Sequence, residues 1–334
     1  MGIELSDVRD ADGLAAIAPE WWDLWQRCPS ATPFQTPAWL VSWWRAFHPG
    51  RLFTIAARRQ GSLVGLAPFY LDGRRLLPFG ISLSDYLDLL IDPQFADDVG
   101  PALLHHLSRT DLQWDEWELP DLQPGATALG LACPSGLTHS IDDQNPCPVL
   151  PLPSTVDDLS EVLPWRKRRQ IRTARNRAAR RGEVAVERVE ADRLEHAYAE
   201  LVRLHEARWQ SRGEPGVLAD PRVRRCHSLA LEPLSRHGLL RFYVLSISGQ
   251  AASVYLGFQH QGRAYGYLVG FDPDYAFESP GTILLAHAIE EAVREGAREF
   301  HFLRGKEDYK YGWGASDRWN KRRIFRRVHA HAEA

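Results

Sequence analysis

A short segment near the end of the chain concentrates side chains that can exchange protons. Residues 300–314 read FHFLRGKEDYKYGWG and include Arg304, Glu307, Tyr309 and Lys310. Joining an acyl group to an amine requires a base for the ammonium, an acid for the leaving group and stabilisation of an oxyanion. Glu307 can act as base or amine anchor, Tyr309 as acid and Lys310 as counter-charge. The alternative is a surface loop held by ion pairs among Arg304, Glu307 and Lys310.

A second chemical feature is a corner between a strand and a helix. Asp272-Pro273 ends an apolar run, and Ser279-Pro280-Gly281 opens an amphipathic run with a hydroxyl and a proline where helices begin. Unpaired N–H groups and the helix dipole at such a start bind anions. The alternative is a plain strand–turn–helix corner. The predicted ligand-binding residues here are Gly270, Phe271, Ser279, Gly281 and Thr282.

The elements that position this corner follow from hydrophobic periodicity. Three runs alternate between apolar and polar residues, which is typical of strands, and short Gly-containing turns join them as an antiparallel meander. An amphipathic helix and a fourth extended run follow, so the fourth strand should lie parallel to the third. The predicted strands are 240–249, 250–260, 263–271 and 299–303, and the predicted helix is 282–296.

The third strand of this meander has features that suit ligand binding. Gly266 and Gly270 lie on one face and leave backbone open to a close ligand. Tyr255 and Tyr267 lie on neighbouring strands and can hold an acceptor molecule. A buried aromatic pair is the alternative, especially for Tyr255.

This order of elements resembles the core of GNAT acyltransferases. In that superfamily the corner holds the pyrophosphate of coenzyme A, and the strand before it holds the pantetheine arm. The resemblance therefore implies an acyl-CoA thioester as co-substrate and no metal. Pro273 and Gly281 fit the family pattern, whereas Ala276 and Ser279 replace its Arg or Gln and its first Gly, which indicates a divergent member.

Other segments resemble the CelD-like acetyltransferases and, more distantly, the Fem-type aminoacyl transferases. The sequence FQTPAWLVSWW at 34–44 and the segment 300–314 carry the first resemblance, and an aromatic–Lys pair carries the second. The resemblance implies that Arg304, Glu307, Tyr309 and Lys310 face the cleft. Asp85 and Tyr86 resemble a recurrent Asp–Tyr pair, which either binds an amine or caps an element.

The chain also shows a weak internal repeat. Residues 92–96 read DPQFA and residues 272–276 read DPDYA, and the elements around them follow the same order. We therefore predict an α/β (α+β) protein with a duplicated GNAT-like fold, in which two mixed sheets are flanked by helices. The predicted domains are a degenerate N-terminal GNAT-like domain at 1–155 and a C-terminal GNAT-like acyltransferase domain at 156–334. The first is expected to be degenerate because Asp97 and Asp98 would repel an anion at its corner. Residues 120–163 are rich in Pro, Gly and Ser and are predicted to be a linker with a strand at 148–152.

Two helices are predicted between the linker and the meander. The segment Arg166–Arg181 is strongly basic and contains no acid, and Ile171, Ala174 and Ala178 form its thin apolar stripe. It is either a solvated face or a phosphate-binding surface, with tRNA as one candidate partner. In the second helix, Arg208 continues the inward stripe and must pair with an acid or bind an anion. His205 on that stripe is either packed or a spare base.

Composition narrows the class of protein. The chain has 334 residues, a net charge of −3 and 44% hydrophobic residues, which suits two ordinary globular domains. No signal peptide or membrane span is expected, so a cytoplasmic location is predicted, and the four cysteines lack metal-site spacing. We predict direct N-acyl transfer from an acyl-CoA-type thioester to a small-molecule amine. The alternatives are a Fem-type transferase that uses aminoacyl-tRNA and a non-catalytic scaffold.

Overall fold

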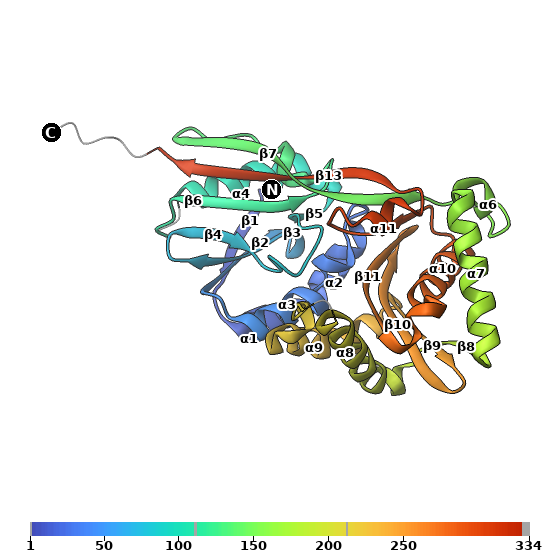
Figure 1. The fold of residues 1–334 in the computed structure, drawn as a ribbon. Helices are drawn as coiled ribbons and strands as arrows, with labels where there is room; N and C mark the ends of the chain where they lie inside the picture. Colours follow the sequence, from blue (N-terminus) through green and yellow to red (C-terminus); the bar gives the residue numbers. More distant parts are fainter. Residues whose placement is uncertain (1, 110–111, 212, 329–334) are drawn as a thin grey trace. The chain divides into compact units, whose positions relative to one another are not determined.

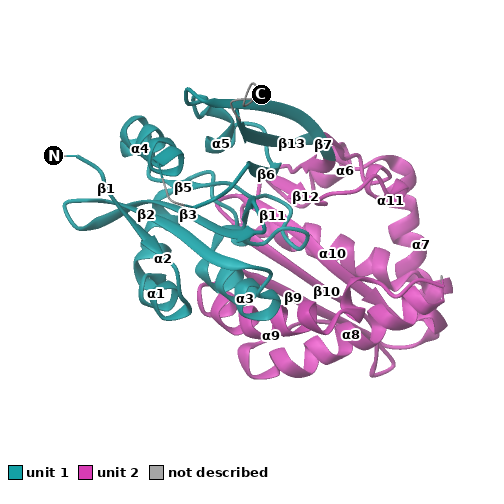
Figure 2. Ribbon diagram, turned by 90° about the vertical axis from the view of Figure 1, so that its left-hand side faces the viewer, with its two compact units in different colours: residues 1–145, 319–334 teal, residues 146–318 magenta. Residues whose placement is uncertain are grey.

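The computed structural model describes residues 2–109, 112–211 and 213–328, and it contains two compact units. Unit 1 comprises Met1–Asn145 with Trp319–Ala334, and unit 2 comprises Pro146–Arg318 (Figure 2). The predicted division at 155/156 thus falls inside unit 2. The reason is that residues 149–151 pair with a strand of unit 2, and the last strand of the chain pairs with a strand of unit 1.

Unit 1 has a mixed sheet with helices (Figure 1). Its strands are β1 (Glu4–Val8), β2 (Arg51–Arg59), β3 (Ser62–Asp72), β4 (Arg75–Pro78), β5 (Leu90–Ile91), β6 (Glu116–Leu122) and most of β13 (Ser316–Arg327). Its helices are α1 (Ala11–Ala16), α2 (Ala18–Arg27), η1 (Pro33–Gln35), α3 (Pro37–Phe47), η2 (Pro93–Phe95), α4 (Ala96–Arg109) and α5 (Thr127–Gly130). The strand order is β1-β2-β3-β4-β6-β13, and β5 pairs with β3.

The aromatic stripe near the N-terminus forms core, as the helical spacing predicts. Trp21, Trp39 and Trp43 are each at most 2% exposed. The Thr36 hydroxyl accepts a hydrogen bond from the Trp39 N–H, and Pro37 is the first residue of α3. A hydroxyl cap followed by proline therefore sets the start of this helix.

Unit 2 likewise contains a mixed set of strands with helices. Its strands are the end of β7 (Leu137–Pro151), β8 (Val184–Arg188), β9 (Leu240–Ile247), β10 (Gln250–His260), β11 (Arg263–Phe271) and β12 (Glu299–His301). Its helices are α6 (Leu159–Val162), α7 (Trp165–Arg181), η3 (Ala191–Arg193), α8 (Leu194–Gln210), η4 (Val217–Ala219), α9 (Pro221–Arg236), η5 (Pro273–Glu278), α10 (Pro280–Arg294) and α11 (Asp308–Tyr311). The strand order is β7-β12-β11-β10-β9-β8, and only β11 and β12 are parallel neighbours in it.

The two units repeat one pattern of strand directions. Among the described strands of unit 1, only β4 and β6 are parallel neighbours. Helix α4 lies between them in the chain, as α10 lies between β11 and β12 in unit 2. The matching turns are both 3-10 helices, in which Asp92 and Asp272 each accept a hydrogen bond from the N–H two residues on. This recurrence is what an internal duplication predicts. The strand that follows the first repeat, β7, pairs through its end with β12 of unit 2, and the strand that follows the second repeat, β13, pairs with β6 of unit 1.

The expected linker at 120–163 is instead largely structured. It contains the end of β6, the helices α5 and α6, and the fifteen-residue strand β7. Most of the first nine residues of β7 are at least partly exposed, so they show no alternation of apolar and polar residues. A strand without a buried face leaves no period-two signal in the sequence, and the prediction failed for that reason.

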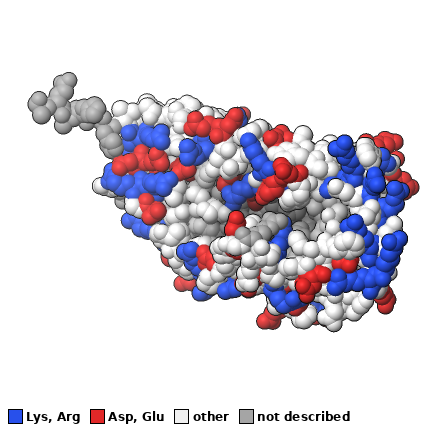
Figure 3. Space-filling view, in the orientation of Figure 1, with Lys and Arg blue, Asp and Glu red and all other residues white. Residues whose placement is uncertain are grey.

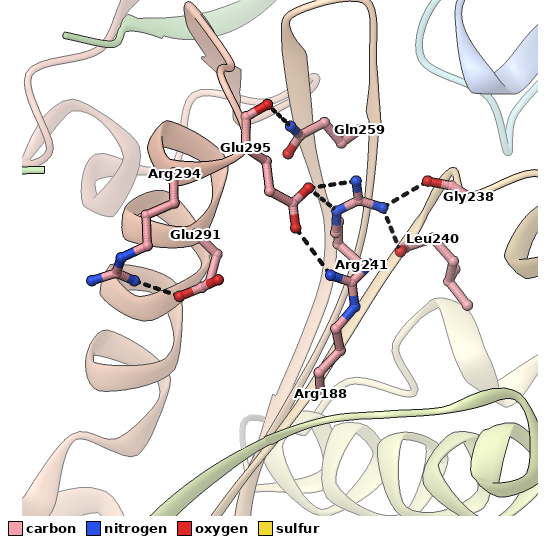
Figure 4. A network of polar contacts seen from close by, with 8 residues as sticks. All are labelled: Arg188, Gly238, Leu240, Arg241, Gln259, Glu291, Arg294 and Glu295. Atoms are coloured by element: carbon pink, nitrogen blue, oxygen red, sulfur yellow. Dashed lines mark hydrogen bonds and ion pairs between the residues drawn. The ribbon is translucent and has the colours of Figure 1, made fainter. Parts of the chain in front are cut away.

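An ion-pair network fixes the C-terminal end of α10 (Figure 4). The Glu295 carboxylate pairs with Arg241 from β9 and with Arg188 from β8, the latter at 3.0 Å. The Gln259 amide of β10 donates to the Glu295 carbonyl at 3.3 Å. These contacts tie the C-terminal end of the helix to three strands.

No helix among the described residues is long and apolar enough to cross a membrane. The same part of the chain shows no cluster of three or more His, Cys, Asp or Glu side chains arranged to hold a metal ion.

Candidate active site

Unit 2 contains a cleft of about 320 Å³ at the N-terminal end of α10. Six of the sequence-predicted residues line it, namely Arg208, Phe271, Ser279, Gly281, Thr282 and Tyr309. Its lining residues include no Asp or Glu. The residues that line it are Lys167, Arg208, Val269, Phe271, Ala276, Ser279, Pro280, Gly281, Thr282, Leu285, Tyr309 and Trp313.

The predicted anion corner forms one end of this cleft. Ser279 adopts a left-handed conformation with φ 53°, which ends η5 and turns the chain into α10. The Ser279 carbonyl accepts the N–H of Thr282 at 3.0 Å, whereas the N–H of Gly281 makes no hydrogen bond in the described structure. A Cβ at Gly281 would meet only the Phe271 and Val269 side chains, at 3.5 and 3.8 Å. A helix dipole and an unused N–H group therefore face an open space.

Gly270 has a different role from the one predicted. A Cβ at this position would lie 3.0 Å from the His205 backbone nitrogen and 3.2 Å from the Leu201 carbonyl oxygen. The missing side chain lets α8 approach β11, so Gly270 serves helix packing and does not line the cleft. Phe271, Ser279, Gly281 and Thr282 do line it.

The edge of β11 forms a second wall. β12 pairs with β11 only along residues 263–265, and among the described strands only β10 pairs with residues 266–271. Arg208 reaches this edge from α8, where its Nη1 donates to the Val269 carbonyl at 3.1 Å and its guanidinium lies 5.0 Å from the centre of the Phe271 ring. Arg208 thus lies on the cleft wall, as a substrate-binding role requires.

Tyr309 brings a phenol to the cleft from α11. Its ring packs edge-on against Phe302, with the ring centres 6.5 Å apart, and 48% of the residue is exposed. Burial of the hydroxyl and the nearby negative charge of Glu307 raise the pKa of Tyr309 to about 12. The phenol is therefore protonated at neutral pH and can donate a proton or a hydrogen bond.

The rest of the predicted catalytic segment turns away from the cleft. Lys310 is 3% exposed, and its ammonium donates to the carbonyls of Leu303 at 3.1 Å and Arg304 at 2.6 Å. It also pairs with the Glu307 carboxylate at 2.9 Å. The expectation that Lys310 faces the ligand is thus corrected, because its own loop surrounds the ammonium. Glu307, with a side chain 58% exposed, and the half-buried Arg304 do not line the cleft either.

The two tyrosines predicted to hold an acceptor are packed elsewhere. Tyr255 is 2% exposed and stacks on Tyr243 with ring centres 5.9 Å apart, which is the buried aromatic pair. The Tyr267 hydroxyl bonds to Nε2 of His227 at 3.0 Å, and Nδ1 of that histidine bonds to the Tyr198 hydroxyl at 2.8 Å. Neither predicted tyrosine lines the cleft, because both point into packed layers of unit 2.

Asp85 and Tyr86 belong to unit 1 and are buried there. They are 5% and 1% exposed. The Asp85 carbonyl accepts from the Asn320 amide at 2.8 Å, and the Tyr86 carbonyl accepts from the Thr32 hydroxyl at 3.3 Å. These contacts support the capping interpretation of the pair, and an amine-binding role stays a prediction.

Lys167 is a charged cleft residue that was not among the predicted site residues. It lies in the first turn of α7, is 8% exposed, and places its ammonium 4.6 Å from the centre of the Trp313 ring. Burial lowers its pKa from the ordinary value. The helical spacing of α7 does indicate that Lys167 faces inward, because it lies one turn before Ile171 on the apolar stripe. The overall basic character of the helix instead favours a single solvated or phosphate-binding surface for all of its basic residues.

Comparison with known proteins agrees with this fold. Residues 166–311 match the family model described as an acetyltransferase (GNAT) domain. No curated protein sequence matches the chain significantly.

Several solved structures are similar over nearly their full length. The crystal structure of FemX matches with a TM-score of 0.66 and 12% identity, covering 95% of this chain and 96% of that one. The structure of L-PGS from Bacillus licheniformis matches with a TM-score of 0.58 and 13% identity, covering 93% and 91%. The C-terminal domain of a putative lysylphosphatidylglycerol synthetase from Agrobacterium fabrum matches with a TM-score of 0.56 and 13% identity, covering 96% and 93%. At these identities the likeness shows the fold. Residues 166–311 thus form a GNAT acetyltransferase domain, and the protein is an acyltransferase.

Proposed function

We propose that unit 2 transfers an acyl group from an acyl-CoA-type thioester directly to an amine. The observation that carries this proposal is the cleft itself, which joins a free helix N-terminus at Gly281 to the protonated phenol of Tyr309. An anionic donor tail would bind at the helix end, and the thioester would lie along the open edge of β11.

In the proposed reaction, the neutral amine attacks the thioester carbonyl, so a C–N bond forms and the C–S bond breaks. The departing thiolate takes its proton from Tyr309, which regains a proton from solvent, and the attacking nitrogen releases its proton to solvent. Glu307 was predicted as base or amine anchor, but it does not line the cleft, so this step does not depend on it. No cysteine lines the cleft, and burial raises the pKa of the Cys226 thiol. The proposed transfer therefore goes directly from thioester to amine, without a cysteine-bound acyl intermediate.

Thermal melting tests the donor. Acetyl-CoA should raise the melting temperature of the wild-type protein, by an amount that grows with the logarithm of its concentration above Kd. Gly281→Val should fold, because a small side chain fits there, yet it should lose this shift because its branches fill the space in front of the N–H. An equal shift in both proteins would mean that the donor binds elsewhere.

A second candidate donor is aminoacyl-tRNA, and the surface of α7 favours it. Grooves of about 580 and 600 Å³ follow this helix, and the first shares Ser279 and Thr282 with the cleft. Figure 3 shows Lys and Arg side chains gathered over α7. Arg166 and Arg169 line the first groove without a carboxylate partner among the described residues, whereas Arg181 pairs with Glu278 at 3.0 Å.

Salt dependence separates the two donors. Binding of charged tRNA should weaken steeply as salt rises, because several phosphates release counterions. Binding of acetyl-CoA through the cleft should change much less. Stabilisation by charged tRNA alone, lost at high salt, would favour the second candidate and reject the first.

A further inference from the structure

Two lysines of unit 2 are buried, and they differ in how their charge is satisfied. Lys310 makes hydrogen bonds to backbone carbonyls and an ion pair. Lys167 has neither a hydrogen bond nor a carboxylate partner in the described part of the chain. Its single polar contact there is the face of Trp313, at 4.6 Å.

Such a charge is costly to bury. An ammonium that leaves water without a counter-ion loses solvation, and a cation–π contact returns only part of that free energy. The lowered pKa of Lys167 has burial as its sole cause, which means that no neighbouring carboxylate or acceptor offsets the loss. The ammonium of Lys167 therefore has no protein counter-ion among the described residues, and it lines a cleft where a ligand can supply one.

The position of Lys167 indicates what completes it. Its side chain lines the cleft beside Trp313, which is 1% exposed, while Tyr309 and the start of α10 line the same cleft. No acidic side chain lines the cleft, and Arg208 and the helix dipole add further positive potential. A substrate ammonium would be repelled here, whereas a phosphate or carboxylate would be attracted.

We propose that Lys167 binds a negatively charged group of the ligand in the cleft, beside Trp313. The matching ligand chemistry is an oxyanion, either a phosphoryl group of the acyl donor or a carboxylate of the acceptor. This inference rests on the proposed function, because it assigns Lys167 to the same cleft. It adds that the part of the ligand next to Lys167 carries a negative charge.

Lys167→Met tests the proposal, because methionine keeps the apolar stem and removes the charge. The melting temperature of the free variant should equal or exceed that of the wild type, since an uncompensated buried charge is gone. Pyrophosphate and coenzyme A should both stabilise the wild type, and their dissociation constants should rise at least about tenfold in the variant. Lys310→Met is the matched control, and it should melt lower while keeping the ligand affinity of the wild type.

Three probes show whether the anion bound by Lys167 is a phosphate or a carboxylate, and they test the coenzyme A donor separately. They are pyrophosphate, coenzyme A and succinate, each titrated against wild type and Lys167→Met by thermal melting. If only succinate stabilises the wild type and Lys167→Met loses that effect, the anion is a carboxylate, so Lys167 keeps its role and the coenzyme A donor is rejected. If pyrophosphate or coenzyme A does so, the anion belongs to the donor.

Other results would overturn the role of Lys167. Equal ligand affinity in wild type and Lys167→Met would show that the ammonium does not contact the anion. A free variant that melts as far below the wild type as Lys310→Met does would show a structural lysine. Absence of stabilisation of the wild type by all three anions would also reject the proposal.

Discussion

Replacing Lys310 by methionine separates a structural role from a chemical one. The ammonium is 3% exposed and holds the carbonyls of Leu303 and Arg304 together with the Glu307 carboxylate. Methionine preserves most of the aliphatic stem but leaves two carbonyls and one carboxylate without their partner. Removing one side of a buried charge network of this kind costs about 3 kcal/mol, near the lower end of the range for such pairs.

The assay is urea unfolding together with thermal melting. For a unit of this size, about 3 kcal/mol corresponds to a melting temperature lowered by roughly 6–12 °C. Lys321→Met is the matched control, because its ammonium lies at the surface, where it pairs with Asp143, and its loss should cost below about 1 kcal/mol. A Lys310→Met variant that melts like the wild type and transfers acyl groups far more slowly would refute this reasoning and restore Lys310 as a catalytic group.

Further predictions concern the role of the Tyr309 phenol and the stability of the protein at acid pH. Tyr309→Phe should lower kcat for acyl transfer to an amine by about a hundredfold, because general acid catalysis contributes at least that much, while the melting temperature stays unchanged. Tyr311→Phe is the control, because it loses only an exposed hydrogen bond to Asp317, and equal rates in both variants would remove Tyr309 from the mechanism. Hydrogen bonds from His301 and Arg318 hold the pKa of Glu299 well below its ordinary value of 4.5, so this carboxylate stabilises the fold above pH 4.5 and loses that effect as the pH falls further. Arg318→Met should therefore narrow the difference in unfolding free energy between neutral pH and about pH 4, and an unchanged difference would show that the pair does not contribute.

The fold was largely readable because its core elements carry strong local signals. Strand β9 largely alternates between buried and partly buried residues, short Gly-containing turns separate it from β10 and β10 from β11, and Pro280 with Gly281 marks the start of α10. β7 was missed over its exposed half, where neither face is buried and composition imitates a linker. The final strand of each repeat joins the other unit, which no local pattern encodes.

The candidate site was predictable in part. Phe271, Ser279, Gly281 and Thr282 share the cleft because a helix start fixes which backbone groups are free, and residue types reveal that start. Tyr255 and Tyr267 were misplaced because a strand has two faces, and the sequence does not say which face opens to a ligand.

The two buried lysines show most clearly where the sequence stops. The sequence by itself determined that unit 2 has a meander, a crossover helix and a strand–turn–helix corner with a helix start at Pro280, because periodicity and helix caps depend on near neighbours in the chain. Tertiary structure alone decided that Lys310 is enclosed by its own loop while Lys167, more than a hundred residues earlier, lies against Trp313 in the cleft. The physical reason is that the free energy of a buried charge depends on which dipoles and charges surround it in space, and those neighbours are set by packing between distant segments.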